Sequence, residues 1–406
     1  MSDAPGFGRR AVIARGSRSA PRSAGRDRAV RDGRPRPSNR WGVVLAVAAA
    51  LALPMGSARA EPALRLLDLP FKVREMRGPR SELAVAVATS GLLPLVRRNE
   101  AGREGGREAS GSGTPIAVVW GDEGGAILLV ENGSVAVKPV GREAVEDLVA
   151  SETPKGALPG VRRALDGPLS AFLTGRTRAP DGSPAAATLA LRERQPLGVT
   201  SEPKPVPVAT TDLPPGDGAV FAPQAPRIVP VAGRPAILAA TVAGAGTGSL
   251  VLITRSGSSP APWSVTARSA PGPRPSLAAV GAFSGADPSE AATVDAKGTL
   301  RLWRLAPDAI TPGPEAAGFL PGEGDAALAD VVQAGHGTEL AVPLAGASAL
   351  VLMSAQGGAL TERLRIALPA PAGSGIASLG EGAASRLVVG LSDGRIAAIA
   401  LDGGRP

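Results

Sequence analysis

Short apolar segments alternate with turns of small and polar residues along most of the chain. Six stretches share one pattern, two apolar segments on either side of a tight turn: 81–96, 114–130, 234–253, 289–305, 338–353 and 385–401. A weaker copy lies at 185–195. Val, Leu, Ile and Ala make up most of the apolar positions, which is typical of buried strands. Each copy is therefore predicted to form a hairpin of two short strands.

The turns and the spacing of these copies predict how the hairpins assemble. Asn132-Gly133 and Asp393-Gly394 are predicted to form type I′ turns, which need two residues with positive φ. Further strands are expected at 261–269 and 360–369. Four short strands in about fifty residues are typical of a β-propeller blade. The sequence therefore predicts an all-β fold, one propeller of about seven four-stranded blades over residues 61–406. The segment 61–76, which alternates over 69–76, is expected to supply the strand that closes the ring.

Three stretches depart from the repeat. The charged, Gly- and Ser-rich segment 97–114 is expected to be a loop, and 141–152 is the best helix candidate. Residues 195–230 are rich in proline and read as an insertion or an extended linker. This segment could divide the chain into two smaller sets of sheets. We prefer one closed ring with an insertion, because closure removes exposed strand edges.

The N-terminal 60 residues have a different composition from the rest. They hold 12 Arg and 3 acidic residues, whereas the remaining residues have a net charge of −1, so the basic excess does not indicate a nucleic-acid-binding domain. Basic residues precede an apolar run from Trp41 to Met55, and Ala58 and Ala60 occupy the small positions of a cleavage site. Residues 1–60 are therefore predicted to be a signal peptide with a long basic n-region. An uncleaved anchor is the alternative. The protein is expected to be exported, to the periplasm or the extracellular space.

The composition offers little for catalysis. The chain has no cysteine and one histidine, His336, so it can form neither a disulfide nor a thiolate metal site. His336 stands in a glycine-flanked turn with no second histidine, and we interpret it as a surface residue. Trp120, Trp263 and Trp303 could stack on sugars or peptides, but packing at strand ends is the simpler interpretation. Trp120 is the one most expected to be exposed, since Gly-Asp-Glu follows it.

One part of the chain resembles a known family. In residues 278–305, Phe283 and Gly285 occupy the aromatic and glycine positions of a calcium-loop motif, Glu290 the closing acid, and 298–303 ("GTLRLW") the strand that follows. These residues, with 328–402, resemble the FG-GAP/VCBS-repeat propellers of bacterial exported proteins, whose blades are similar to those of integrin α chains. The resemblance implies a propeller fold with calcium loops in its blades.

The loops of this chain depart from that motif where calcium would bind. Ala282, Ser284 and Ala286 replace most of the expected oxygen ligands, and Asp287 is out of register. In the next copy, Asp330 and Glu339 flank a segment without an acid. Calcium takes six to eight oxygen ligands, several usually from carboxylates. We therefore predict that these loops do not bind calcium.

These observations favour a non-catalytic protein. We find no catalytic, cofactor-binding or metal-binding residue in the sequence. The expected function is that of an exported binding or scaffold protein, a monomer that contacts a protein or glycan partner through its loops. The alternatives are an enzyme-type propeller, such as a hydrolase or lyase, and an assembly factor for envelope proteins that acts by strand augmentation.

Overall fold

The computed structural model of the protein describes most of the residues after the predicted signal peptide. They are 62–89, 115–195, 205–244, 246–255, 262–285, 289–322, 328–334, 337–346, 348–380 and 382–401. All of them belong to one compact unit, Arg59–Pro406. The predicted signal peptide, the charged segment 97–114 and His336 lie outside the described residues. In the part that is described, no helix is long and apolar enough to cross a membrane.

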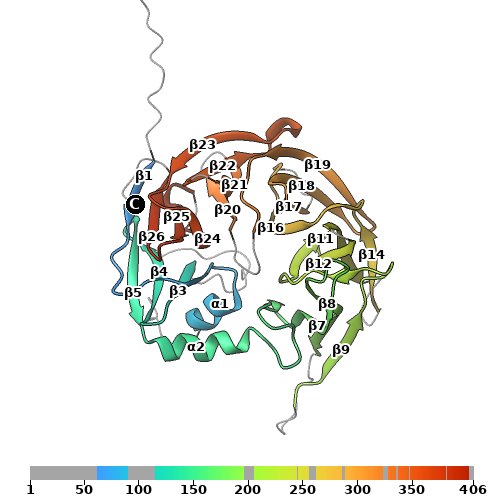
Figure 1. Cartoon of the computed structure of the whole chain (residues 1–406). Coiled ribbons are helices and arrows are strands. Elements are labelled where there is room, and N and C mark those ends of the chain that lie inside the picture. The colour runs from blue at the N-terminus through green and yellow to red at the C-terminus, as the bar shows by residue number, and fades with distance from the viewer. Residues whose placement is uncertain are drawn as a thin grey trace, which may run out of the picture. The chain divides into compact units, whose positions relative to one another are not determined.

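The described residues form an all-β, propeller-like fold of antiparallel sheets (Figure 1). The N-terminal sheet has four strands, β2 (Glu75–Arg77), β3 (Ile116–Trp120), β4 (Gly125–Glu131) and β5 (Ser134–Val140). The second sheet along the chain is larger and is described below. The third sheet consists of β16 (Pro275–Gly281), β17 (Ser289–Asp295), β18 (Thr299–Ala306) and β19 (Ala309–Ala317). The fourth is β20 (Asp330–Ala334), β21 (Gly337–Pro343), β22 (Ala349–Ser354) and β23 (Thr361–Ala367).

The fifth, or closing, sheet joins strands from opposite ends of the described chain. Its members are β24 (Ala372–Leu379), β25 (Arg386–Leu391), β26 (Ile396–Ala400) and β1 (Ala63–Leu66). β1 pairs antiparallel with β26, from Ala63 opposite Ala400 to Leu66 opposite Ala397. The pairing places an early strand at the outer edge of the last sheet (Figure 1). The segment 61–76 was predicted to close the ring because 69–76 alternates, but the pairing strand β1 lies before that part of the segment.

The remaining sheet has ten strands and lies second along the chain. They are β6 (Ala164–Asp166), β7 (Leu169–Arg178), β8 (Pro184–Arg194), β9 (Val208–Leu213), β10 (Val220–Phe221), β11 (Arg227–Val231), β12 (Arg234–Gly244), β13 (Thr247–Arg255), β14 (Trp263–Arg268) and β15 (Gly272–Pro273). The two-residue strand β10 pairs with both β8 and β12 and so joins two meanders, β6–β9 and β11–β14. The proline-rich segment 195–230 therefore contributes the strands β9, β10 and β11.

Most of the predicted hairpins are confirmed. The stretches 114–130, 234–253, 289–305, 338–353 and 385–401 each form two paired strands. The weak copy at 185–195 is instead a single strand, β8, which pairs with β7. The inner strands of neighbouring sheets contact one another, β24 with β2 and β20, and β16 with β12 and β20.

Apolar clusters fill the junctions between most neighbouring sheets. Five such clusters lie between the N-terminal and closing sheets, the closing and fourth sheets, the fourth and third sheets, the third and ten-stranded sheets, and the two meanders of the ten-stranded sheet. Burial of this apolar surface is the main stabilising contribution to such a fold.

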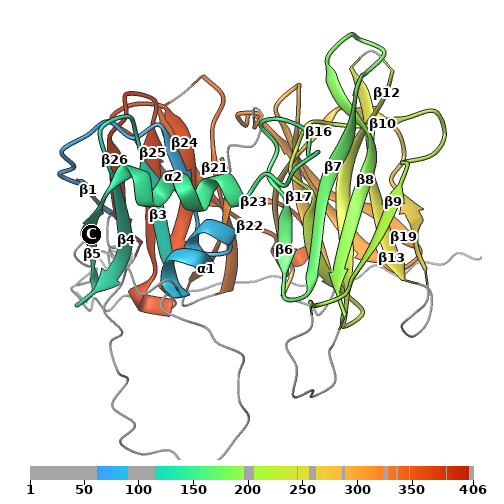
Figure 2. The same ribbon diagram turned by 90° about the horizontal axis from the view of Figure 1, so that it is seen from below.

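Two helices occupy the remaining junction, between the N-terminal sheet and the ten-stranded sheet. Figures 1 and 2 show α1 (Glu82–Thr89) and α2 (Arg142–Ser151) between β3 and β7. Both helices pack on β3 and β4 in an apolar cluster that contains no residue of the ten-stranded sheet. We call this junction the helical seam. An ion pair and a hydrogen bond of Arg163, the residue before β6, connect the helices to the ten-stranded sheet.

The helix α1 contradicts the prediction of a strand at the start of 81–96. Ser81 precedes the helix, and its Oγ accepts a hydrogen bond from the Ala84 amide at 3.1 Å, which caps the N-terminus. Leu83 and Val87 are buried on one face, whereas Val85 is exposed. The alternating Ala and Val of this segment look like a strand, but the cap and the helical spacing of the buried positions decide the structure. The other predicted helix, 141–152, is confirmed as α2.

Turn chemistry gives the first testable prediction. Asn132 and Gly133 have φ of 51° and 77°, as the predicted type I′ turn requires, whereas at 393–394 only Gly394 has positive φ. We expect Gly133→Ala to destabilise the protein by about 1 kcal/mol, because a Cβ disfavours this backbone region. Urea denaturation of wild type and variant measures this change in the free energy of unfolding. Gly272→Ala is the control, since its φ is ordinary and an added Cβ meets nothing within 4 Å. Equal effects of the two substitutions would contradict the turn assignment.

Candidate binding pocket at the helical seam

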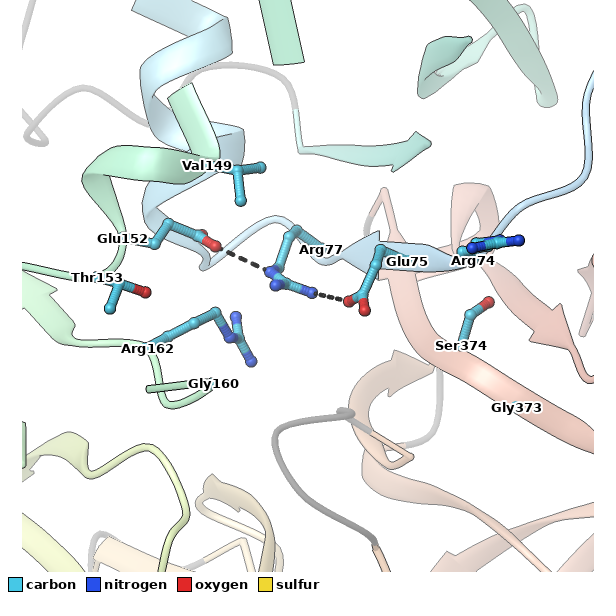
Figure 3. Close-up of a pocket in the computed structure, with 10 residues that line it drawn as sticks. All are labelled: Arg74, Glu75, Arg77, Val149, Glu152, Thr153, Gly160, Arg162, Gly373 and Ser374. Atoms are coloured by element: carbon cyan, nitrogen blue, oxygen red, sulfur yellow. Dashed lines mark hydrogen bonds and ion pairs between the residues drawn. The ribbon is translucent and has the colours of Figure 1, made fainter. Parts of the chain in front are cut away.

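A cavity of about 430 Å³ opens at the helical seam (Figure 3). Its walls come from β2, the end of α2, the loop after α2 and the start of β24, so it lies where three sheets approach one another. The lining residues are Arg74, Glu75, Arg77, Val149, Glu152, Thr153, Gly160, Arg162, Gly373 and Ser374. Charged side chains dominate this lining, which sets the cavity apart from the apolar cores on either side.

Arg77 is the central side chain of the pocket. It is only 10% exposed, and it donates from Nε to Glu152 Oε2 at 3.0 Å and from Nη1 to Glu75 Oε2 at 2.9 Å. Its guanidinium lies 5.0 Å from the centre of the Trp120 ring, a favourable cation–π contact. Burial lowers the pKa of Arg77, but the charges of Glu152 and Glu75 outweigh it and hold the pKa above its ordinary value. Arg77 is therefore a fixed positive charge.

Glu152 connects β2 to both helices. It follows the last residue of α2, is 2% exposed, and accepts the bond from Arg77. Its Oε1 also accepts a hydrogen bond from the Leu83 amide at 3.4 Å, in the first turn of α1. A carboxylate at a helix N-terminus is favoured by the unpaired amides and the helix dipole. The buried Glu152 charge is thus balanced by one guanidinium and one helix end.

A second ion pair ties the ten-stranded sheet to α1. Arg163, immediately before β6, donates from Nε to Glu82 Oε2 at 2.6 Å and from Nη2 to Glu82 Oε1. These hydrogen bonds raise the pKa of Arg163. The Arg163 amide also donates to the Glu152 carbonyl at 2.9 Å. An ion pair and a hydrogen bond therefore tie the helices to the start of the ten-stranded sheet.

Two further arginines line the pocket. Arg74 forms an ion pair with Asp122 at 2.6 Å, but its side chain is 70% exposed, so this pair contributes little to stability. Arg162 extends from the loop after α2 toward Arg77 (Figure 3). On the opposite wall, the buried Oγ of Ser374 has no hydrogen-bond partner among the described residues. It lies against Gly390 of the neighbouring strand β25, in the space that a side chain at that glycine would need.

A second cavity, of about 390 Å³, lies beside the closing sheet. It is lined by Leu67, Leu69, Pro70, Phe71, Lys72, Glu123, Asp393, Gly394 and Arg395. Apolar side chains contribute more of this lining than in the first cavity. Arg395 and Asp393 pair with each other at its rim.

The stretch that resembles a calcium loop has a structural role. The Glu290 carboxylate is buried and accepts hydrogen bonds from the amides of Phe283 and Ser284, both at 2.8 Å. It therefore fixes the loop through backbone N–H groups. Asp330 accepts a bond from the Ser378 amide, and Glu339 pairs with Arg363. Among the described residues no three His, Cys, Asp or Glu side chains are placed to hold a metal ion.

This role of Glu290 gives a second prediction. We expect Glu290→Ala to destabilise the protein by about 1–3 kcal/mol, because it leaves two amides without their acceptor. The loss should be the same in calcium and in EDTA. Thermal melts of wild type and variant under both conditions provide the measurement. A calcium-dependent rise in Tm that disappears in the variant would show instead that Glu290 binds the ion.

The three tryptophans that the structure describes are buried and do not form a binding surface. Trp120, Trp263 and Trp303 are 8%, 7% and 6% exposed. The expectation that Trp120 is exposed is therefore wrong: it packs against α1 and α2 and lies beneath Arg77. Trp303 donates from Nε1 to Thr293 Oγ1 at 2.8 Å within its own sheet. Packing at strand ends is the interpretation that holds.

Sequence reasoning did not find the Arg77 network. Its members come from separate elements, and the segment 97–114 lies between them in the chain. One weak signal was present, since Glu152 ends the predicted helix 141–152 where the helix dipole disfavours an acid. Such an acid needs another partner, and Arg77 with the N-terminus of α1 supplies it.

Comparisons with known proteins give no family for this chain. No family model matches it, and no curated protein does. Among solved structures, it is similar to Trypanosoma rangeli sialidase, with 12% identity over 71% of this chain and 53% of that one and a TM-score of 0.35. AofleA from Arthrobotrys oligospora matches with 8% identity, coverage of 84% and 86%, and a TM-score of 0.34. A Bacteroides fragilis protein described as a candidate 6-phosphogluconolactonase matches with 11% identity, coverage of 68% and 74%, and a TM-score of 0.35. Likenesses this distant carry no argument about function.

Proposed function

We propose that the chain is an exported, non-catalytic β-propeller that binds a protein or glycan partner. In this proposal the two meanders of the ten-stranded sheet count as two blades, so that the ring has six blades where the sequence predicted about seven. The helical seam then fills the junction between the first and second blades. The degenerate calcium loops fit a ring that is held by apolar clusters and by ion pairs.

One observation carries the proposal of binding without catalysis. In the pocket at the helical seam, both lining carboxylates accept hydrogen bonds from Arg77. A general acid or base has to exchange its proton with the substrate. Glu75 and Glu152 are instead engaged in holding a guanidinium, and the rest of the charged lining is arginine. This arrangement suits recognition of a polar ligand.

A hydrolase or lyase is the second candidate, because the pocket does contain two carboxylates and is large enough for a small molecule. The two functions differ in what happens to the bound material. We expect the purified protein to bind an envelope protein or polysaccharide saturably and to return it chemically unchanged, as judged by mass spectrometry. Conversion of a glycoside, ester or lactone panel that is lost in Glu152→Gln would establish the enzyme and overturn the proposal.

Export is a separate part of the proposal and rests on residues 1–60. We expect these residues, fused to a reporter enzyme that is active only outside the cytoplasm, to give activity. Mass spectrometry of the exported protein should find Glu61 at its N-terminus. A reporter that stays inactive would overturn export, and an intact membrane-bound N-terminus would favour the anchor.

A further inference from the structure

We propose that the chain forms a two-fold symmetric dimer in which the open edge of β9 pairs antiparallel with β9 of a second copy. β9 is the outermost strand of the first meander and pairs with β8 along one edge (Figure 1). Among the described residues, no strand pairs with its other edge. This inference goes beyond the proposed function, and it replaces the monomer that the sequence analysis expected.

The register of β8 and β9 shows which backbone groups of β9 face outward. The Gln195 amide donates to the Pro207 carbonyl at 2.8 Å, so Pro207 and every second residue after it turn their backbone groups toward β8. These groups alternate in direction along an antiparallel strand. The N–H and C=O groups of Val208, Thr210 and Asp212 therefore point away from β8. They form a row of donors and acceptors along the open edge.

The sequence of β9 lacks the residues that keep edge strands from pairing. Proline and charged residues, lysine above all, block the edges of natural sheets. β9 reads VATTDL, with a single charge and no proline. The outer strands of the N-terminal, third and fourth sheets do carry blocking residues, which are Lys138 and Pro139 in β5, Pro312 and Pro314 in β19, and Glu362, Arg363 and Arg365 in β23. Compared with these three edges, β9 is a free template for another strand.

Two copies of β9 complement each other in one register. Antiparallel pairing needs outward-facing residues opposite one another. A register centred on Thr210 sets Thr210 opposite itself and Val208 opposite Asp212, so each outward residue both donates and accepts. A register centred on Asp212 would set two carboxylates opposite each other, which is destabilising. Pro214, the next residue in the outward series, has no N–H to extend the ladder. The same edge is used by both copies, so the assembly closes as a dimer.

Charge complementarity favours a second copy as the occupant of this edge. Arg194 of β8 lies opposite Val208, so the two side chains share one face of the sheet. In the dimer, Asp212 of the second copy lies on the same face, on the far side of Val208. Two strand spacings separate the Cα atoms of Arg194 and this Asp212 by about 10 Å, which the long arginine side chain can span. Both side chains are exposed, and symmetry forms the ion pair twice.

The dimer also covers apolar surface that is open in the single chain. Val208 is 51% exposed, one of the few large apolar side chains that the structure leaves so open. The stem of Arg194 and the backbone of the second copy would lie on either side of it. One strand pair buries less than the ~1,200 Å² of a stable interface, so we expect a weak, reversible dimer.

Sedimentation velocity of the chain that begins at Glu61, which contains every described residue, tests the proposal. We expect a monomer–dimer equilibrium between about 10 µM and about 1 mM. Arg194→Asp and Asp212→Arg should each weaken the dimer by at least about tenfold, because each sets like charges together. The two substitutions combined should restore it, since the ion pair is then reversed. Arg304→Asp, at an exposed arginine of β18 in the third sheet, is the matched control and should change nothing.

Thr210→Pro and two cysteine variants test the backbone pairing and its register. Thr210→Pro should abolish the dimer without loss of a hydrogen bond to β8, because the N–H that it removes points outward. Its urea midpoint shows whether the variant is folded. The chain has no cysteine, so a short bismaleimide can join two copies of Thr210→Cys only at that site. Two copies of Val208→Cys lie about 14 Å apart in the proposed register and should be joined much less.

Three outcomes overturn the proposal. The first is a chain that remains monomeric at about 1 mM. The second is a dimer that persists in Thr210→Pro or is not restored by the exchange of charges, since it then forms through another surface. The third is a monomeric chain whose wild type captures an envelope protein that Thr210→Pro does not, which gives the edge to that partner. The proposed function is judged separately, because a partner bound equally well by wild type and Thr210→Pro leaves it standing.

Discussion

Glu152→Ala should lower the free energy of unfolding by about 3–5 kcal/mol, the largest loss that we expect from a single substitution at the helical seam. The change leaves Arg77 nearly buried without its buried carboxylate, and removal of one partner of a buried ion pair is strongly destabilising. It also removes the acceptor of the Leu83 amide at the start of α1. Urea unfolding followed by circular dichroism gives the value.

Glu75→Ala is the matched control, because Glu75 binds the same guanidinium from a position that is 53% exposed. We expect it to cost less than about 1 kcal/mol, as for other exposed ion pairs. Glu152→Gln should fall between the two, since its single amide oxygen can still accept from one of the two donors, Leu83 or Arg77. A cost for Glu75→Ala equal to that of Glu152→Ala would mean that burial does not decide the strength of this network.

A chain that begins at Asp68 should lose at least about 3 kcal/mol relative to one that begins at Glu61. It lacks β1 and Leu67, and removal of one well-buried leucine side chain alone typically costs about 2–5 kcal/mol. Leu67 is 7% exposed, packs between the N-terminal and closing sheets, and donates its amide to the Ile396 carbonyl at 2.9 Å. Denaturant unfolding of the two chains provides the comparison.

The shortened chain should also associate with itself as its concentration rises. Without β1, the strand β26 becomes the edge of its sheet, and its buried apolar residues form a template for pairing with another chain. Light scattering measures this association. Leu66→Ala, at a residue that is 37% exposed, is the control and should change stability by less than about 1 kcal/mol. A monomeric Asp68 chain of unchanged stability would show that the pairing with β26 does not hold the sheet together.

The repeating hairpins could be predicted from the sequence because their signals are local. In 385–401 and 289–305, each strand is a short apolar run and each turn lies within a few residues of both strands it joins. In both segments the apolar pattern and the turn residues predict the same hairpin, and the structure contains it. The weak copy at 185–195 has no second apolar run, and its partner β7 precedes it in the chain. The direction of pairing cannot be deduced from such a segment.

Long-range contacts decide the parts that the sequence did not predict. The segment 82–89 contains valine and alanine in alternation, and besides the local Ser81 cap it is the packing of Leu83 and Val87 on β3 and the carboxylate of Glu152 that favour a helix. The pocket depends on the same kind of contact. Arg77 and Glu152 belong to separate elements, and a single sequence contains no measure of their proximity.

The pairing of β1 with β26 also sets the order in which the molecule can be completed. A ribosome makes β1 before any of the other described strands and β26 after them, so the outer strand of the closing sheet waits for its partner throughout synthesis. Contacts so distant in sequence form slowly, because a very long loop must close first. The intermediate sheets can assemble in chain order, but the ring stays open until β26 has been made. Between the synthesis of β1 and that of β26, a chaperone would protect the incomplete chain and a protease would cut it.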